Sequence, residues 1–406
     1  MVPALSRRRL LTAAGTLAAT AAVGAGGALA QSSPVSNGAW PMAQRDPAGT
    51  CHAPDATPPK DDVAVRWKRP ADPDRGFVYG TPPVVADGRV YVVGDDLQVL
   101  DAKTGAVRFR DERGFRSAPA VAPARAYHSP TLGVVGEDGA VGLHANGGVD
   151  LFGQQAGLTR WTRSATDEVR SLFGGAEFQP PPVAAGQTLL FSTAGELFAV
   201  DASSGRVRWR RDVDASRPVV HDGTVYAADY GEGIFGYDLA SGDRESRWRV
   251  SGTLVLGLTA GPEQLVVATD DGLAGVTYDG TTRWRFEPDA LYRDRGAVAL
   301  ADDVAYGGFR GEEEDWLVAV DTADGTEVWR SPAVPESTPQ FAPPAVANDT
   351  VYVPAEDQGL VAVDANDGSI RWRFDTDDLL PFSPAALVGD ACYVLGPNHV
   401  YALAEP

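Results

Sequence analysis

The side chains of this sequence that could act as metal ligands or nucleophiles are few and scattered. The five histidines are His52, His128, His144, His221 and His399. None of them has a partner at metal-ligand spacing, so the sequence predicts no zinc site. It also has no G-x-S-x-G elbow, no G-K-[ST] loop and no C-x-x-C pair. A hydrolase or lyase would need an acid–base pair, and none can be identified.

Two short motifs imitate ligand-binding loops. Residues 231–236 read Gly-Glu-Gly-Ile-Phe-Gly, which matches the G-x-G-x-x-G string of dinucleotide-binding turns. The string lies between two expected strands with no helix to present N–H groups, so a β-hairpin is the favoured interpretation. The densest acidic run, residues 312–315, is predicted to be a solvated loop, with a loose cation site as the alternative.

The elements that position these residues form a repeat. One unit has an apolar strand, a Gly/Asp turn, a strand ending in Asp, a Gly turn and a strand with an aromatic residue. Residues Val361 to Asp364, followed by Gly368 and Trp372, are a clear copy. The closing aromatic residues of the units are Trp67, Phe109, Trp161, Trp209, Trp248, Trp284, Trp329 and Trp372. Their spacing of 36 to 52 residues predicts the blades of a β-propeller.

The two ends of the chain each supply part of one unit. Residues 63–67 read as the last strand of a blade, and residues 392–403 read as a blade that stops before its last strand. We therefore expect an all-β, eight-bladed propeller of four-stranded antiparallel blades, closed by the N- and C-terminal strands. Seven blades is the alternative, if the degenerate unit between Leu132 and Trp161 is a loop. Within each unit, Asp should accept turn N–H groups, Gly should supply positive φ and Trp should pack against the neighbouring blade.

The two cysteines, Cys51 and Cys392, fall near this junction. Cys392 occupies the slot of Val351 and Val225 in other units, so it should be buried. A disulfide between Cys51 and Cys392 would clasp the ring, with a stabilisation of about 4 kcal/mol or less. The alternative is a pair of buried thiols that act as small apolar groups.

Charge and the first residues indicate export. The formal net charge is −20, and lysine is limited to Lys60, Lys68 and Lys103. So acidic a surface repels phosphate backbones and argues against a nucleic-acid partner. It is typical of a salt-loving organism, with an ordinary acidic exported protein as the alternative.

Residues 1–30 have the charged, apolar and small-x-small regions of a signal peptide, and the arginines at 7–9 resemble a twin-arginine signal. A Sec signal and a retained anchor are the alternatives. Removal of the three arginines of this peptide leaves 32 basic against 55 acidic residues, or −23. We expect a lead-in segment at 31–62, the propeller at 63–406, and an extracytoplasmic, secreted or cell-surface protein without a transmembrane segment.

The Asp-x-x-x-Gly turn and the following Trp resemble the pyrroloquinoline-quinone-type (PQQ-like) repeat, over about residues 40 to 406. Trp40-Pro41-Met42 also looks like the segment that precedes such propellers. That family includes quinoprotein dehydrogenases and non-enzymatic scaffolds similar to the lipoprotein of the outer-membrane assembly machine. The dehydrogenases commonly use a vicinal disulfide and a calcium ion beside the quinone, whereas Cys51 and Cys392 are not adjacent. This chain also lacks the lipid-anchor cysteine of the scaffold.

The resemblance and the residues together favour a non-catalytic binding or scaffold propeller without a cofactor. The alternative is a quinoprotein oxidoreductase that uses PQQ and calcium on alcohols or aldose sugars. We expect a monomer with a protein or small-molecule partner that the sequence does not identify.

Ligands of propellers usually bind at the mouth of the central channel, where loops join one blade to the next. The candidate binding residues in these loops are Phe115, Arg116, Phe178, Gln179, Arg217, Tyr292, Arg293, Gln340, Phe341 and Phe382. Aromatic and arginine side chains at a rim would make a binding face. The alternative is that they plug the channel.

Overall fold

A computed structural model gives the fold. It describes residues 38–71, 81–94, 96–137, 139–147, 149–151, 154–156, 159–164, 179–193, 195–229, 233–250, 254–288, 291–292, 298–310, 315–332, 343–355, 359–376, 383–396 and 398–406. All regular elements in these ranges are strands. None of the described residues belongs to a helix that is long and apolar enough to cross a membrane.

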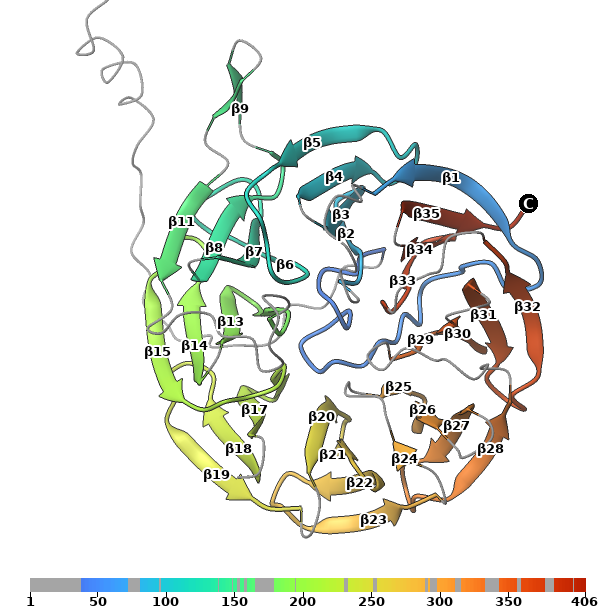
Figure 1. The fold of residues 1–406 in the computed structure, drawn as a ribbon. Coiled ribbons are helices and arrows are strands. Elements are labelled where there is room, and N and C mark those ends of the chain that lie inside the picture. Colours follow the sequence, from blue (N-terminus) through green and yellow to red (C-terminus); the bar gives the residue numbers. More distant parts are fainter. Residues whose placement is uncertain are drawn as a thin grey trace, which may run out of the picture.

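The described strands form a closed ring of eight antiparallel sheets, the blades of a β-propeller (Figure 1). Blade 1 comprises β2 (Val84–Ala86), β3 (Arg89–Val93), β4 (Leu97–Asp101) and β5 (Val107–Asp111). Blade 2 comprises β6 (Ala120–Ala122), β7 (Thr131–Gly136), β8 (Gly139–His144) and β11 (Thr159–Ser164). Blade 3 comprises β12 (Val183–Ala185), β13 (Thr188–Thr193), β14 (Glu196–Asp201) and β15 (Val207–Asp212). Blade 4 comprises β16 (Val219–His221), β17 (Thr224–Asp229), β18 (Gly233–Asp238) and β19 (Arg244–Trp248).

The second half of the ring repeats this order. Blade 5 comprises β20 (Val255–Ala260), β21 (Gln264–Thr269), β22 (Gly272–Thr277) and β23 (Thr282–Phe286). Blade 6 comprises β25 (Ala299–Ala301), β26 (Val304–Arg310), β27 (Asp315–Asp321) and β28 (Glu327–Ser331), with the short β24 (Leu291–Tyr292) also paired to β26. Blade 7 comprises β29 (Ala345–Ala347), β30 (Thr350–Ala355), β31 (Gly359–Asp364) and β32 (Ile370–Phe374). Blade 8 comprises β33 (Ala386–Val388), β34 (Ala391–Leu395), β35 (His399–Ala404) and β1 (Ala64–Pro70).

The two ends of the chain close the ring, as the sequence predicts. β1 pairs with β35 in antiparallel register from Ala64 opposite Ala404 to Pro70 opposite His399. β35 in turn pairs with β34, so blade 8 holds strands from both ends of the chain in one sheet. Sharing a blade removes the open sheet edges that a linear array would leave at its two ends.

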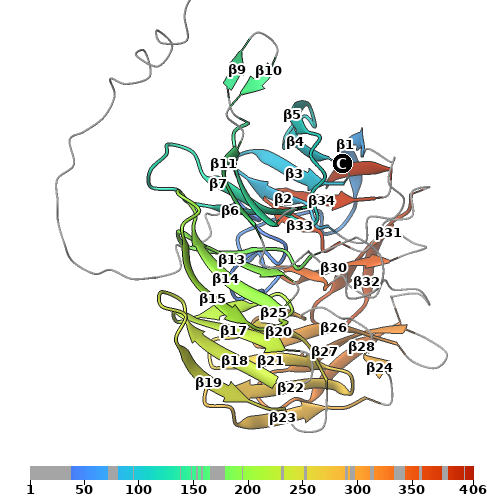
Figure 2. The ribbon, with the colours of Figure 1, turned by 60° about the vertical axis from the view of Figure 1, so that its left-hand side comes forward.

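The degenerate second unit is a blade, so the seven-blade alternative is wrong. β6, β7, β8 and β11 form a four-stranded sheet like the others. Its repeat is hard to see because a hairpin, β9 (Val149–Leu151) paired with β10 (Gln154–Ala156), is inserted between β8 and β11. This hairpin projects away from the ring (Figure 2).

The closing aromatic residues join neighbouring blades. Most of each middle strand is buried, whereas the outer strands bury little besides their aromatic residue, as in β5 around Phe109. The indole N–H of Trp67 in blade 8 donates to the Ala102 carbonyl of blade 1 at 2.9 Å, and that of Trp161 donates to Ala202 of blade 3 at 3.0 Å. Seven of the eight rings, all except Trp372, also lie against the turn glycine of the next blade, for example Trp67 against Gly105. The glycine is therefore required for its positive φ and for the close approach of the ring.

In blades 1, 3, 4, 6 and 7, the Asp at the end of the third strand organises the turn below that ring. Asp101 Oδ1 accepts the backbone N–H groups of Lys103 and Thr104 at 3.1 and 2.9 Å. Asp364 likewise accepts the N–H of Asn366 at 2.8 Å. These contacts confirm that the Asp–Gly segments are structural turns.

Candidate functional site

The axis of the propeller is occupied by the chain itself. Residues 40–57, here called the axial segment, run through the centre of the ring (Figure 1). Its backbone pairs with the first strands of six blades and with the β33–β34 turn of blade 8. The blade residues bonded in this way are Val85, Val121, Val220, Ala260, Leu300, Val346 and Gly389. The segment therefore links seven of the eight blades through main-chain hydrogen bonds, among the described residues.

Apolar residues of the axial segment belong to the core. Trp40 and Cys51 are fully buried in one cluster with residues of blades 6, 7, 8 and 1. Met42 is buried in a second cluster with residues of blades 2, 3 and 4. Burial of these side chains explains why an otherwise irregular segment has a fixed path through the ring.

The candidate residue Arg217 bonds to two residues of the axial segment. Arg217 Nη1 donates to Gln44 Oε1 at 2.6 Å and its Nη2 donates to the Asp46 carbonyl at 3.2 Å. Asp46 itself accepts from Thr50 N at 3.1 Å and lies 3.8 Å from Arg45. Burial lowers the pKa of Arg217 to about 10, opposed by the charge of Asp46. Arg217 thus anchors the axial segment from the loop before blade 4.

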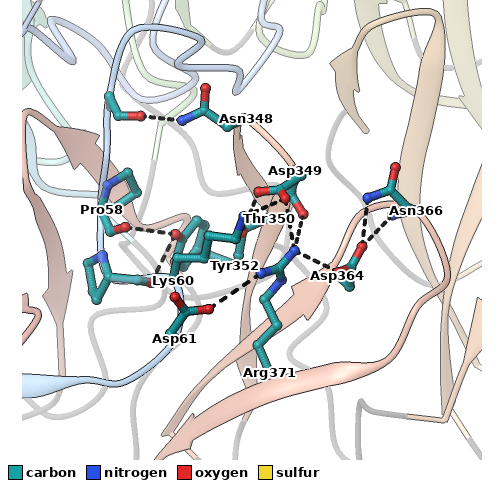
Figure 3. A network of polar contacts seen from close by, with 12 residues as sticks. Pro58, Lys60, Asp61, Asn348, Asp349, Thr350, Tyr352, Asp364, Asn366 and Arg371 are labelled. Carbon is teal, nitrogen blue, oxygen red and sulfur yellow. Dashed lines mark hydrogen bonds and ion pairs between the residues drawn. The ribbon is translucent and has the colours of Figure 1, made fainter.

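The segment leaves the axis through a polar network on blade 7 (Figure 3). Tyr352 donates its hydroxyl to Pro59 O at 3.0 Å, and the Trp372 indole N–H donates to the same oxygen at 3.1 Å. In blades 2, 3, 5, 6 and 8 the corresponding indole donates to a turn carbonyl of the following blade, so Pro59 O takes the place of that acceptor in blade 7. Lys60 then donates to Asp349 at 2.6 Å, and this ion pair lowers the pKa of Asp349.

Arg371 completes the network from the outer strand of blade 7. Its Nη2 donates to Asp349 at 3.0 Å and to Asp364 at 2.6 Å. The network joins β32, the start of β30 and the lead-in chain, so it secures the exit of the axial segment.

Three other candidate residues at the channel mouth are described. Phe115 is buried, and its backbone bridges Gly136 at the β7–β8 turn. Arg116 is half-buried and forms an ion pair with Glu137 at 3.1 Å. Its carbonyl accepts the N–H of buried Gln179 at 2.7 Å, so the structure brings Arg116 and Gln179 together.

The remaining candidates cannot be placed in the same way. Phe178, Arg293, Gln340, Phe341 and Phe382 lie outside the described residues, and Tyr292 is described only through its backbone pairing with Phe309. The whole mouth as a binding face therefore stays a prediction.

Both cysteines are buried thiols in the structure. Cys51 lies on the axial segment and bonds through its carbonyl to Val346, whereas Cys392 lies in β34 of blade 8. Both belong to one hydrophobic cluster, and burial raises the pKa of the Cys392 thiol. The disulfide clasp stays a prediction. Alkylation of unfolded, unreduced protein would add two labels if the thiols are free and none if they are bonded.

The residues do not fit the quinone site that the resemblance implies. A vicinal disulfide needs adjacent cysteines, whereas Cys51 and Cys392 belong to the axis and to a blade. The backbone of the axial segment pairs with the first strands around the axis and fills this space. Within the described ranges, no three His, Cys, Asp or Glu side chains are grouped so that they could hold a metal ion.

Sequence reasoning placed residues 31–62 before the propeller and missed the path of residues 40–57 along its axis. The available signal was the apolar content of Trp40, Met42 and Cys51 in a segment without strand periodicity. It also missed the replacement of the turn Asp by His144 in blade 2, whose surroundings are described below.

Relatives with assigned names cover most of the chain. The protein named outer membrane protein assembly factor BamB from Yersinia pestis is 25% identical over 307 residues, 71% of this chain and 74% of the relative. The protein of the same name from Burkholderia pseudomallei (strain K96243) is 26% identical over 364 residues, 82% of this chain and 86% of the relative.

Solved structures show the same fold at low sequence identity. A quinohemoprotein alcohol dehydrogenase from Pseudomonas putida HK5 superimposes with a TM-score of 0.69 at 12% identity, covering 91% of this chain and 81% of that one. BamB from Moraxella catarrhalis gives a TM-score of 0.62 at 16% identity, covering 84% of this chain and 100% of that one. Both similarities concern the fold alone.

The family described as outer membrane protein assembly factor BamB matches residues 145–276 and 262–404. The matched ranges overlap and together take in more than half of the sequence. They include the turns and aromatic residues that join blades 2 to 7. This chain therefore belongs to that family of PQQ-like repeat propellers.

Proposed function

We propose that this protein is an exported, non-catalytic propeller that binds a partner in the cell envelope as a scaffold. The observation that carries the proposal is the axial segment, which is hydrogen-bonded to seven blades along the axis. A propeller built in this way offers its faces and loops to a partner. The names of its relatives, which refer to outer membrane protein assembly, support a protein partner and an extracytoplasmic location. The signal-like residues 1–30 support export, and their arginines support the twin-arginine route.

The channel-mouth loops are the proposed partner face. Arg116 lies there beside Gln179, with its guanidinium partly exposed and paired to an exposed Glu137. Such a surface ion pair is weak, so a partner can replace it without a large loss of stability. Arginine is also a frequent source of binding energy at protein interfaces.

The test combines capture with a cofactor assay. Tagged propeller is incubated with cell-surface fractions at native salt, and partners captured by the wild type are compared with those of an R116A/R293A variant. The matched control is Arg283→Ala, which removes another exposed, ion-paired arginine in the outer strand of blade 5. We expect the double variant to lose a partner that the control keeps. Equal capture by all three proteins would contradict the proposed face.

The cofactor arm separates the scaffold from the quinoprotein alternative. The purified protein is mixed with pyrroloquinoline quinone and calcium, and dye reduction is followed with alcohols and aldose sugars. We expect no reduction above that of the quinone alone. Saturable, substrate-dependent reduction would overturn the non-catalytic assignment.

A further inference from the structure

Blade 2 lacks an ion pair that its neighbours use to fix the Asp turn. In blades 1, 3 and 7, the arginine before the closing aromatic residue binds the carboxylate of the turn Asp. These pairs are Arg108 with Asp101, Arg208 with Asp201, and Arg371 with Asp364. In blade 2 the corresponding arginine is Arg160, and the position of the Asp is occupied by His144, the last residue of β8.

Arg160 is consequently held by neutral acceptors. Its Nη1 donates to Thr131 Oγ1 at 2.6 Å, and its Nη2 lies 2.6 Å from Ser129 Oγ and 3.0 Å from His144 Nδ1. Its Nε is buried without a hydrogen-bond partner. Among the described residues, no carboxylate forms an ion pair with Arg160, and burial lowers its pKa without a carboxylate to oppose the shift.

The histidine contributes a second donor. Because Nδ1 accepts the Arg160 hydrogen bond, the neutral His144 ring carries its proton on Nε2. Desolvation, and to a smaller extent the positive charge of Arg160, lowers the pKa of His144, which favours this neutral form. The cluster thus presents donors from a guanidinium and an imidazole.

An inserted loop adds an exposed aromatic ring to Arg160 and His144. Residues 123–130 connect β6 to β7, where blades 1 and 3 have two-residue turns. This loop places the centroid of the Tyr127 ring 4.1 Å from Arg160 Cζ, and Tyr127 is 42% exposed. The ring also packs edge-on against His144, with 5.7 Å between centroids.

The cluster lies on the face opposite the channel-mouth loops. In an antiparallel blade, the links between strands one and two and between strands three and four share one end. The 123–130 loop and the β9–β10 hairpin are both links of this kind, so the two insertions of blade 2 lie at the same end of its strands. The mouth loops share the other end, with the β7–β8 turn that Phe115 bridges.

We propose that Arg160, His144 and Tyr127 form a binding site for a carboxylate, supplied by an acidic side chain of a protein partner. The ligand class follows from blades 1, 3 and 7, where a carboxylate from the chain itself meets the arginine. In blade 2 the described residues supply Arg160 with neutral acceptors only, which leaves the place of the carboxylate to a ligand. Arginine binds carboxylates through directional, charge-assisted hydrogen bonds, and an aromatic ring stacked on the guanidinium holds it in place. The carboxylate site stands on geometry, whereas its assignment to a protein partner rests on the proposed function.

The first arm of the test uses sodium formate and an isosteric pair of variants. Chloride is replaced by formate at constant sodium concentration, and the side-chain NMR signals of Arg160 and His144 are followed. We expect saturable shifts in the wild type and in His144→Asn, which supplies no carboxylate. His144→Asp rebuilds the ion pair of the neighbouring blades, so it should weaken binding by at least about tenfold, the equivalent of one charge-assisted hydrogen bond. Shifts that do not saturate, or that are equal in His144→Asp, would overturn the site.

The second arm tests the source of the carboxylate. N-acetylglutamate amide is titrated against the same signals, with N-acetylglutamine amide as the uncharged control. Binding of the glutamate compound at least as tightly as formate, with none of the glutamine compound, supports a protein side chain as ligand. Binding of formate without the glutamate compound would overturn that assignment while leaving the carboxylate site intact. Loss of the partner-capture result alone would affect the proposed function and not this site.

Discussion

Replacing Gly105 by alanine should destabilise the protein through the contact that closes the ring. Gly105 has a φ of +67°, and a Cβ built on it would lie 2.7 Å from two atoms of the Trp67 ring. Trp67 belongs to β1, the N-terminal strand of blade 8, whereas Gly105 belongs to the turn of blade 1. A methyl group at this position must therefore push two blades apart at the seam of the ring.

The same blade contains a matched control. Gly88 has nearly the same φ, +69°, but a Cβ built there meets nothing within 4 Å. Gly88→Ala should cost only the strain of a left-handed alanine, about 1–2 kcal/mol. Gly105→Ala should cost this amount plus about 1–3 kcal/mol for overpacking against Trp67. The difference between the two variants isolates the contact between the blades.

Urea unfolding at fixed salt, followed by tryptophan fluorescence, measures both variants. The free energy of unfolding should fall by more in Gly105→Ala than in Gly88→Ala. Blade 3 offers a repeat of the comparison, because Gly205 lies under Trp161 and Gly186 faces open space. Equal losses within each pair would refute the idea that the turn glycines are needed for the neighbouring ring.

Two further predictions concern charged groups. Hydrogen bonds from Arg108 and Thr104 lower the pKa of Asp101 to about 2, below its unfolded value of about 4. Ionised Asp101 therefore stabilises the folded state above about pH 4, and this contribution is lost as the pH falls through the folded pKa. Asp101→Asn should be less stable than the wild type at pH 6, and urea midpoints should converge between about pH 4 and 2; a constant difference would contradict the assignment. Arg217→Gln should loosen the axial segment, because it removes the hydrogen bonds of Arg217 to Gln44 and Asp46. Limited proteolysis should therefore cleave near Gln44 and Asp46 sooner than it does in the control Arg283→Ala. Identical cleavage rates in the two variants would count against Arg217 as the anchor.

The architecture was predictable because each blade repeats the same local rules. The turn is specified by Asp101 and Gly105, and the aromatic residue that follows supplies a large ring for packing between blades. Neither needs information from the rest of the chain. Eight such units, with complementary fragments at the two ends, leave ring closure as the solution without open edges. The inserted β9–β10 hairpin hid one unit, but Trp161 still marked its outer strand.

The contents of the axis were not predictable in the same way. The axial segment has no periodic pattern, because its partners are the first strands of different blades and not one continuous sheet. The role of Arg217 depends on where Gln44 and Asp46 lie, 171 to 173 residues away in the chain. The site around His144 was readable in principle, since aligning the repeats shows a histidine where Asp is expected. The contact of Tyr127 with Arg160 could not be predicted from the repeat, because Tyr127 lies in an irregular loop.

The axial segment and the closing strand belong to one continuous stretch, residues 40–70, and this couples the centre of the ring to its seam. Separating β1 from β35 would remove the Trp67 ring from its contact with blade 1. It would also release the preceding chain, which is held in the polar network on blade 7 by the ion pair of Lys60 with Asp349. Conversely, the axial bonds to Val346 and Gly389 can form only when blades 7 and 8 exist. These contacts join residues some 300 positions apart, so they are expected to form late in folding. Until they form, strand edges at both ends of the array stay open to aggregation. A ring whose axis and seam depend on the same stretch of chain therefore gains from completing its fold before it meets a partner or a membrane. This favours the proposed twin-arginine route, because that route moves proteins that are already folded.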